Sequence, residues 1–597
     1  MKTFVSRRIR IAFRLKPSNG INHFLIVCAI DFFCNLALAN VGVVRSKQNP
    51  NLTSALQFRM NECVMTRILL FLAAISFGIL PLAAEPALIP RPAELCETAG
   101  TFSLKAGAFA YVPMDAQALY LDTLSKAAGF SVVLAPADAS CAIQFLGTDS
   151  APKDQAKPTG EGYIIRVLPK TVIVHSATPA GRFHGLQTLA QLLKGAEKTA
   201  EQLTLPCMTI ADAPRFGWRG FMLDESRHFS GPEAVKRLID TMAHYHLNRL
   251  HWHLTDSPGW RIEIKKYPKL TEIGSRGSET DRSPDAPRQF YTQEEIREIV
   301  AYAKARQITI VPEIDMPGHA DAAVISYPEH DGGGFTRKTG NSWPHFTFNP
   351  ARAETLAFLD DILAEVAGLF PDAGVIHFGG DEVHFGWKKW SDLPDVKALM
   401  KREGFTKLAE VETWFNRRMA KTINGLGFAT GGWDEIATRD LPRDKTLVFW
   451  WRHDKPMVLR SALDAGYPVV LCPRRPLYFD FVQDGAHKVG RRWGGFNPLG
   501  QVYAFPESLK TLRPGDTEKN LVRGIQACLW SETTVTQERR DFMAFPRLLA
   551  LAEAAWTPAG RKDFDSFQTR LKEHMPRLRE RGLHPYDPFE KSPEIKR

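Results

Sequence analysis

Between residues 216 and 530, short apolar segments alternate with amphipathic ones, and this alternation restricts the fold more than any other feature of the sequence. Eight strands are expected, at residues 220–224, 248–254, 307–314, 374–379, 427–433, 446–451, 467–471 and 523–530. Apolar residues at helical spacing lie between most of them, as in 232–245, 292–305 and 353–369. Strands joined by helical crossovers form parallel sheets, so the pattern predicts an α/β chain with a closed (β/α)₈ TIM barrel. An open doubly wound sheet is the alternative, but no Gly-rich phosphate loop supports it.

The barrel does not account for the whole chain. The predicted parts are a small α+β sheet-and-helix domain at 85–213, the barrel at 214–559 and a basic C-terminal helix packed on the barrel at 560–597. In the α+β domain, residues 162–168 and 171–177 alternate as strands around a Pro-Lys turn, and 181–194 has helical spacing. We expect one helix to cover this sheet, and we expect no chemistry from it. The barrel segment is longer than the roughly 250 residues typical of the fold, which leaves room for long loops.

Residues 65–84 resemble a targeting segment. One Arg, an apolar run at 68–82 and two alanines before Glu85 predict a signal peptide at 65–84, cut after Ala84. The run is shorter than the roughly 20 residues of a membrane span, so we expect export to the periplasm or the outside, without stable membrane insertion. Our hypothesis is that translation starts at Met65 and that 1–64 is a non-native or disordered extension.

The net charge of +10 gives little information about the substrate. Residues 1–64 contain nine Lys and Arg against two Asp and Glu, so +7 of the +10 lies in that stretch. The rest of the chain carries the remaining +3 (10 minus 7), which argues against a nucleic-acid footprint, and we expect no nucleic-acid partner.

Five cysteines follow residue 84, at positions 96, 141, 207, 472 and 528. An odd number excludes complete pairing, and none has metal-ligand spacing. We expect most of them to be buried thiols.

Carboxylates, cations and aromatic rings stand directly after the predicted strands. In chain order they are Asp224, Arg227, Asp256, Asp315, His319, Asp381, Glu382, Trp433, Asp434, Glu435, Trp450, Trp451, Tyr478, Asp480, Trp530 and Glu532. Any one of them can be a structural residue, but barrel enzymes build their sites from strand ends at one face. Aromatic rings beside carboxylates and an arginine suit a sugar, whose C–H faces pack on rings and whose hydroxyls need polar partners. The sequence therefore predicts a glycan-binding active site.

The motif HFGGDE at 377–382 is the sharpest of these signals. Two glycines end a strand and let the backbone approach a ligand, and Asp381 and Glu382 follow in succession. Neighbours at a strand end cannot stand on opposite sides of a scissile bond, as an ordinary acid and nucleophile pair must. We therefore expect Glu382 to be the general acid and Asp381 to hold another group on the same side.

The motif HWH at 251–253 allows a second interpretation. Two histidines on one face of a strand can bind a metal, and Asp256 and His319 could complete the ligand set of a metal-dependent hydrolase. Histidines hydrogen-bonded in the core are favoured over this, and no metal or cofactor is predicted.

Six segments together resemble one family. RGFMLDESRHF (219–229), HLNRLHWHLTDSPGWRIEIKKYPKLTEIG (246–274), VPEIDMPGHADA (311–322), HFGGDEV (377–383), GGWDEI (431–436) and QACLWSE (526–532) are similar, in this order, to the β-N-acetylhexosaminidases of glycoside hydrolase family 20. The resemblance extends over about residues 86–585. It implies a (β/α)₈ barrel that removes terminal N-acetylhexosamine (GlcNAc or GalNAc) with retention of configuration, using the acetamide of the substrate as the nucleophile.

The resemblance also implies a role for each matching residue. Glu382 is then the proton donor, Asp381 orients the acetamide, and Tyr478 donates to the acetamide carbonyl oxygen. Asp256 and His319 support Glu382 as a hydrogen-bonded relay. The residues implied for binding are Arg227 for the ring hydroxyls, Trp433, Trp451 and Trp530 for the acetamide methyl and the sugar face, and Glu532 and Asp480 for the 4- and 6-hydroxyls.

Three points depart from the family pattern or lie outside it. Ser257 stands where an Asp commonly follows Asp256, which affects local support. Trp450 and Trp451 both qualify for the aromatic wall, and Trp451 is chosen because it directly precedes Arg452. The loops around 281–290 and 485–500 match no motif and are expected to shape the site beyond the first sugar.

A catalytically inactive glycan-binding protein is the remaining alternative, but such a protein would be expected to lack Asp381 or Glu382.

Overall fold

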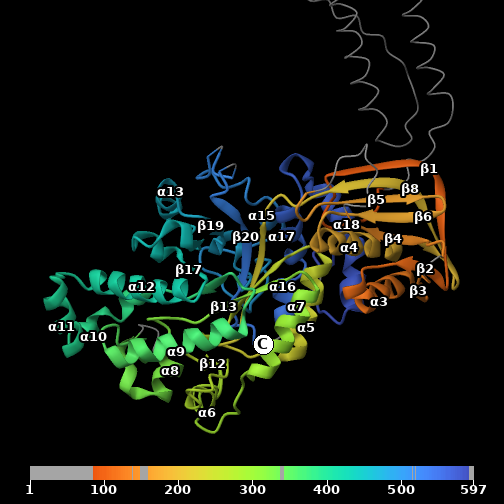
Figure 1. Ribbon diagram of the computed structural model, residues 1–597. Helices are drawn as coiled ribbons and strands as arrows, with labels where there is room; N and C mark the ends of the chain where they lie inside the picture. Colours follow the sequence, from red (N-terminus) through yellow and green to blue (C-terminus); the bar gives the residue numbers. More distant parts are fainter. Residues whose placement is uncertain are drawn as a thin grey trace, which may run out of the picture. The chain divides into compact units, whose positions relative to one another are not determined.

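The computed structural model of the 597-residue chain describes residues 85–136, 139–147, 159–336, 342–513, 515–517 and 519–590. The predicted signal peptide and the extension before it lie outside these residues. Within them, eight parallel strands close into a barrel in the order β10-β13-β16-β17-β18-β19-β20-β9 (Figure 1). The predicted fold class is confirmed.

The barrel strands are short and almost entirely buried, and each coincides with one predicted segment. They are β9 (Trp218–Asp224), β10 (Arg249–His253), β13 (Thr309–Glu313), β16 (Val375–His377), β17 (Ala429–Trp433), β18 (Thr446–Trp450), β19 (Val469–Leu471) and β20 (Val522–Leu529). The parallel register sets His253 beside Glu313 and Glu313 beside His377, so these three residues belong to one layer of the barrel.

Helices surround the barrel, including the three that the sequence predicts. The helices between or after the strands are α5 (Pro232–His244), α6 (Lys269–Glu272), α7 (Gln293–Ala305), α8 (Asp321–Ser326), α9 (Ala353–Leu369), α10 (Trp387–Trp390), α11 (Pro394–Glu403), α12 (Leu408–Gly425), α13 (Pro456–Asp464), α14 (Arg474–Leu477), α15 (Leu499–Tyr503), α16 (Gln537–Ala544) and α17 (Arg547–Trp556). The link from β17 to β18 differs from the others, because residues 434–445, all of which are described, contain only the 3₁₀ helices Asp434–Thr438 and Arg443–Lys445.

Two small hairpins extend the loops that follow β10 and β13. They are formed by β11 (Thr255–Asp256) with β12 (Gly259–Trp260), and by β14 (Asp331–Thr336) with β15 (Ser342–Phe348). The first hairpin contains Asp256 itself. These insertions account for part of the length beyond a minimal barrel.

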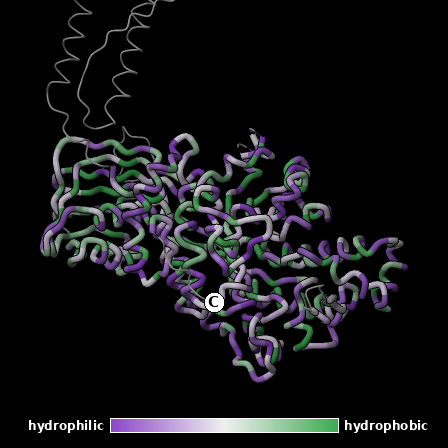
Figure 2. The backbone as a smooth tube through the Cα atoms, turned by 180° about the vertical axis from the view of Figure 1, so that it is seen from behind, coloured by the Kyte–Doolittle hydropathy of each residue, from purple (hydrophilic) through white to green (hydrophobic). Residues whose placement is uncertain are grey.

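The N-terminal domain is a mixed sheet with two helices. Its strands are β1 (Glu94–Lys105), β2 (Ala108–Tyr111), β3 (Val132–Leu134), β4 (Ile143–Leu146), β5 (Tyr163–Leu168), β6 (Thr171–His175), β7 (Glu197–Lys198) and β8 (Gln202–Asp212). The expectation of one covering helix was wrong, because α3 (Gln117–Ala128) lies beside α4 (Pro179–Gly195). The amphipathic pattern of α3 is weak, with only Tyr120, Leu124, Ala127 and Ala128 buried. Apolar residues concentrate on the strands of this sheet and in the middle of the barrel (Figure 2).

Helix α4 is buried on nearly all sides because it lies between the sheet and the barrel. Gln191 on α4 donates to the carbonyl of His244, the last residue of α5, at 3.1 Å. The predicted C-terminal helix is α18 (Phe564–Glu580), and its Arg570 forms an ion pair of 2.7 Å with Glu553 on α17. Its residue Glu580 also pairs with Lys194 on α4 at 2.7 Å. The tail thus contacts the N-terminal domain as well as the barrel.

A buried arginine joins the two domains. Arg219 on β9 is fully buried and donates to both carboxylate oxygens of Glu161, at 3.2 and 2.5 Å. Its other donors reach the carbonyls of His246 and Phe216. Burial alone raises the pKa of Glu161, but Arg219 and His184 outweigh it and hold that pKa well below its ordinary range.

Of the five cysteines after residue 84, three are buried thiols, at positions 207, 472 and 528. Among the residues that the structure describes, every helix is too short or too polar to cross a bilayer.

We predict that Glu161→Gln lowers the free energy of unfolding by about 2–3 kcal/mol at pH 7, because it leaves the buried Arg219 without a counter-charge. The contribution is present above the unfolded pKa of about 4.3 and is lost as the pH falls through the lower folded pKa, so the difference from wild type shrinks in acid. Urea unfolding followed by tryptophan fluorescence measures both effects. The control is Glu201→Gln at an exposed site, which is expected within about 0.5 kcal/mol of wild type. An equal loss in both variants would contradict the prediction.

Candidate active site

All predicted site residues lie at one end of the barrel. Because the strands are parallel and closed, their C-terminal ends meet at a single mouth. The residues brought there are Arg227 after β9, Asp256 after β10, His319 after β13, Asp381 and Glu382 after β16, Trp433 at the end of β17, Trp451 after β18, Tyr478 and Asp480 after β19, and Trp530 and Glu532 after β20. Sequence positions spread over more than half of the chain therefore form one site.

The floor of this site is a buried carboxylate, Glu313, in the layer defined by the strand register. Its oxygens lie 2.6 Å from Nδ1 of His253, 2.7 Å from Nδ1 of His377 and 3.0 Å from Nε2 of His251. The indole N–H of Trp433 donates to Oε1 at 2.9 Å. Burial by itself raises the pKa of Glu313, but the three histidines outweigh it and hold that pKa well below its ordinary value.

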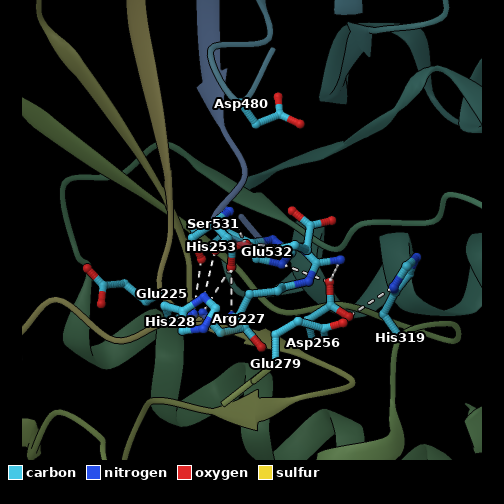
Figure 3. Close-up of polar contacts among 12 residues, drawn as sticks. Glu225, Arg227, His228, His253, Asp256, Glu279, His319, Asp480, Ser531 and Glu532 are labelled. Carbon is cyan, nitrogen blue, oxygen red and sulfur yellow. Dashed lines mark hydrogen bonds and ion pairs between the residues drawn. The ribbon is translucent and has the colours of Figure 1, made fainter. Parts of the chain in front are cut away.

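Asp256 links this floor to the mouth. Its carboxylate oxygens lie 3.1 Å from Nε2 of His253, 2.5 Å from Nη2 of Arg227 and 3.0 Å from Nδ1 of His319. Figure 3 shows Asp256 between Arg227 and His319. Burial raises the pKa of Asp256, but Arg227 and His319 lower it further and keep the carboxylate ionised.

The serine at position 257, where the family commonly has an aspartate, is explained by its local contacts. The Ser257 N–H donates to Asp256 at 2.5 Å, and its hydroxyl donates to Asp321 at 2.7 Å. Both bonds fix the turn of the β11–β12 hairpin, so serine supports Asp256 at this position.

His319 is the point where the relay meets the two consecutive acids. Its Nε2 lies 3.5 Å from Oδ2 of Asp381 and 3.7 Å from Oε2 of Glu382. Burial lowers the pKa of His319, but Asp256 and Asp381 raise it well above its ordinary value, so the imidazole is cationic at neutral pH. One imidazolium thus faces both acids, which places the two carboxylates on the same side of the site.

A tight glycine turn presents these acids. Gly379 has φ +70°, and a Cβ there would lie 2.1 Å from Oδ1 of Asp315. Glu382 itself has φ +55° and begins the short 3₁₀ helix Val383–Phe385. Burial, with Glu313 nearby, raises the pKa of Asp315, whose side chain lies against the turn, well above its ordinary value.

Four aromatic rings after neighbouring strands lie close to one another at the mouth of the barrel. Trp433 and Trp530 lie 5.7 Å apart, Tyr478 is 6.0 Å from Trp530, and Trp451 stacks on Tyr478 at 6.4 Å with an 11° interplanar angle. Trp451 is partly exposed and donates to Glu435 at 3.0 Å, whereas Trp450 is buried in the main hydrophobic core. Of the two neighbours, Trp451 is therefore the one that faces the mouth.

The ring nitrogens of the two histidines in the HWH motif contact residues in and around the floor of the site. His253 bridges Glu313 and Asp256, while His251 Nδ1 accepts from Gln526 at 3.0 Å, which places the His251 proton on the nitrogen that faces Glu313. Among the described residues, four groups have ligand atoms within 4.8 Å of one another and could hold a cation: His251, Glu313 and His377; His253, Glu313 and Asp315; Asp256, Asp315 and His319; and His319, Asp381 and Glu382. Only the last of these groups contains residues that are not fully buried.

Sequence reasoning missed several residues that support the site. Glu313 was not assigned a role, although a charged residue inside an otherwise apolar strand was a usable signal. Glu279 lies just before the loop around 281–290, and Arg491 lies in the loop around 485–500; neither loop matches a motif. The backbone N–H of Glu279 donates a hydrogen bond to the carbonyl of Arg227 at 2.9 Å. Arg491 forms ion pairs with Asp480 and Glu532. No sequence pattern connects residues whose contact depends on how two loops fold over the barrel.

Comparisons with known proteins agree with this arrangement. Residues 216–559 match the model of the glycosyl hydrolase family 20 catalytic domain, and 85–213 match domain 2 of the same family. The chain is 38% identical to a β-hexosaminidase of Porphyromonas gingivalis over 72% of its own length, although it spans only 55% of that protein. It is 36% identical to a β-hexosaminidase of Vibrio furnissii, covering 79% of this chain and 76% of the relative.

A solved structure extends the comparison to three dimensions. The family 20 exo-β-N-acetylglucosaminidase of Vibrio harveyi, determined in complex with N-acetylglucosamine, superposes with a TM-score of 0.76 at 33% identity. The match covers 85% of this chain and 79% of that one.

We predict that Gly379→Ala destabilises the fold more than Gly374→Ala, its matched control at the other end of β16. Both glycines have positive φ, which costs alanine about 1–2 kcal/mol. Only Gly379 is opposed by a neighbour, so Gly379→Ala should lose a further 1–3 kcal/mol or so from overpacking. Urea unfolding of the two variants gives the comparison, and equal losses would show that Asp315 yields freely.

Proposed function

Because the chain belongs to glycosyl hydrolase family 20, we propose that it is a retaining exo-β-N-acetylhexosaminidase that releases terminal GlcNAc or GalNAc by substrate-assisted catalysis. Membership of the family makes the chain a glycoside hydrolase. The observation that supports the mechanism most directly is the single imidazolium, His319, that faces both Asp381 and Glu382.

Glu382 is the proton donor in this proposal. Its side chain is 29% exposed and is the more accessible of the two acids, as a group that must reach a glycosidic oxygen requires. His319 is held by Asp256 and keeps the carboxyl group oriented toward the mouth. After the aglycone leaves, the same carboxylate removes a proton from the attacking water.

Asp381 orients the acetamide. Its Oδ2 faces His319, while Oδ1 is buried and accepts no hydrogen bond from the described residues. An amide N–H of the substrate can supply the missing donor, since buried acceptors are costly when unpaired. The carbonyl oxygen of the acetamide then attacks the anomeric carbon, and the negative Asp381 stabilises the oxazolinium charge.

The aromatic wall suits the apolar parts of this substrate. Trp433, Trp451 and Trp530 enclose the acetamide methyl and one sugar face, and the hydroxyl of Tyr478 donates to the acetamide oxygen. Trp433 is anchored to Glu313 through its N–H, so the wall and the charged floor are fixed together.

The polar edge suits the hydroxyls. Arg227 is held by Asp224 and Asp256, and its guanidinium lies 4.9 Å above the Trp530 ring, from where it can donate to ring hydroxyls. Glu532 and Asp480 accept from the 4- and 6-hydroxyls. The two configurations at C4 can share this edge, which is why both GlcNAc and GalNAc are included.

We predict that the activity of one variant depends on the leaving group of the substrate and that the activity of a second variant does not. Glu382→Gln should lower kcat by about 10²–10⁴-fold on an aryl N-acetylglucosaminide with a poor leaving group, and far less on a dinitrophenyl glycoside that needs no protonation. Asp381→Asn should impair both substrates, because the acetamide loses its orientation in either case.

Two controls bear on this prediction. An aryl glucoside without the acetamide should be a very poor substrate for the wild type, and a thiazoline analogue of the intermediate should inhibit strongly. Near-native turnover by either variant on the poor leaving group, or no inhibition by the thiazoline, would refute the mechanism.

A metal-dependent hydrolase is the competing function, on the grounds that His319, Asp381 and Glu382 could hold a cation. We predict that dialysis against EDTA leaves kcat and KM of the wild type unchanged within about twofold, because the proposed acid needs no Lewis acid. Loss of activity in EDTA, with recovery when Zn²⁺ is added, would favour the metal-dependent hydrolase.

A further inference from the structure

The loop between β19 and β20 returns to the mouth at Arg491. The Arg491 N–H donates to the Asp480 carbonyl at 2.8 Å, and its own carbonyl accepts from Val482 at 3.1 Å. Gly490, with φ +129°, permits this approach, because a Cβ there would lie 2.9 Å from Val482 and 3.0 Å from the Asp480 carbonyl. The backbone of Arg491 is thus fixed beside the residue that its side chain contacts.

The Arg491 guanidinium joins the two carboxylates assigned to the sugar hydroxyls. Its Nε lies 3.3 Å from Oδ2 of Asp480, and its Nη2 forms an ion pair with Oε1 of Glu532. Asp480 follows β19 and Glu532 follows β20, so one planar fork spans two strand ends. A lysine cannot reproduce this arrangement, because its charge is a single point.

Each carboxylate keeps one oxygen available. Asp480 Oδ1 and Glu532 Oε2 are both buried, and neither has a hydrogen-bond partner among the residues that the structure describes. Arg491 therefore occupies one oxygen of each acid and leaves the other as an acceptor without a donor. Two unpaired buried acceptors, on acids joined by one guanidinium, call for a ligand with two hydroxyl donors.

The electrostatic balance of this edge also depends on Arg491. Burial raises the pKa of Asp480 to about 7, with Arg491 and Arg547 opposing the rise and Glu532 adding to it. Burial also raises the pKa of Glu532, but Arg491 and Arg227 bring it below its ordinary value. Removal of Arg491 would leave two neighbouring acids with one fewer counter-charge, and both would move or take up protons.

We propose that Arg491 is a specificity-determining positioning residue, which holds Asp480 and Glu532 so that their free oxygens receive the 4- and 6-hydroxyls of the terminal sugar. This inference rests on the proposed function and adds to it a residue outside the family motifs. Arg491 acts through the two acids and takes no part in proton transfer at the glycosidic bond.

The test measures kcat and KM of Arg491→Met on p-nitrophenyl GlcNAc and on its 4-deoxy and 6-deoxy analogues. KM for the parent substrate should rise about 10- to 100-fold, the size of a lost contact to a charged group, while kcat changes only a few-fold. The deoxy analogues should lose much less in the variant than in the wild type, because the hydroxyls no longer have fixed acceptors.

Arg492→Met is the matched control, since it removes the same charge from the next position of the loop. Arg492 is exposed and donates to the Gly485 carbonyl, away from both acids, and its variant should match wild-type KM within about twofold. Arg491→Lys should recover part of the KM effect, and Arg491→Gln provides a second variant should Arg491→Met fail to fold. Circular dichroism and unfolding midpoints establish the folding of each.

Each outcome has a distinct meaning. Suppose that the wild type turns over the parent glycoside, but that folded Arg491 variants keep the wild-type KM or lose as much activity as the wild type on the deoxy analogues. The role of Arg491 alone would then be overturned. An equal KM rise in Arg492→Met would overturn it as well, because general loop charge would then explain the effect. A wild type that neither hydrolyses the glycoside nor binds GlcNAc in calorimetry would overturn the proposed function, and the role of Arg491 with it.

Discussion

The carboxylate of Glu313 is the buried charge around which the active site is organised. A carboxylate taken out of water is tolerated only when hydrogen bonds and opposite charges replace its solvent. Here the replacements come from three barrel strands, as His251 and His253 from β10, His377 from β16 and Trp433 from β17. Because the same contacts position His253 and Trp433, satisfying Glu313 also fixes the first supports of the catalytic groups.

From this floor, charges alternate in sign up to the mouth of the barrel. His253 connects Glu313 to Asp256, Asp256 binds Arg227 and His319, and His319 faces Asp381 and Glu382. From Glu313 to His319, every member is held by a neighbour of opposite charge, so the geometry is set before a substrate arrives. Such preorganisation suits chemistry in which charge develops at a fixed place, as at an oxazolinium ring.

The eight strands and the residues after them were predictable because both signals are local. An apolar run of strand length and the polar residues that end it occupy adjacent positions, and a parallel barrel brings all such ends together. The helix α3 was missed because only four of its twelve residues are buried, which weakens the helical pattern. The role of Glu313 was missed because a charge inside a strand signals that it has a partner but does not say which one, and only the register shows the histidines beside it.

The sequence alone therefore predicted the α/β barrel, the succession of Asp381 and Glu382 after a strand, and the family resemblance. The resemblance in turn implied the pairing of Asp256 with His319, whose side chains lie 3.0 Å apart in the structure. Tertiary structure decided which of two adjacent tryptophans faces the mouth, which nitrogens the floor histidines use, and that Arg491 bridges Asp480 and Glu532. The physical reason is the distance along the chain over which each signal acts. Backbone periodicity is written in neighbouring residues, whereas a buried ion pair joins side chains whose separation in the chain carries no information about their distance in space.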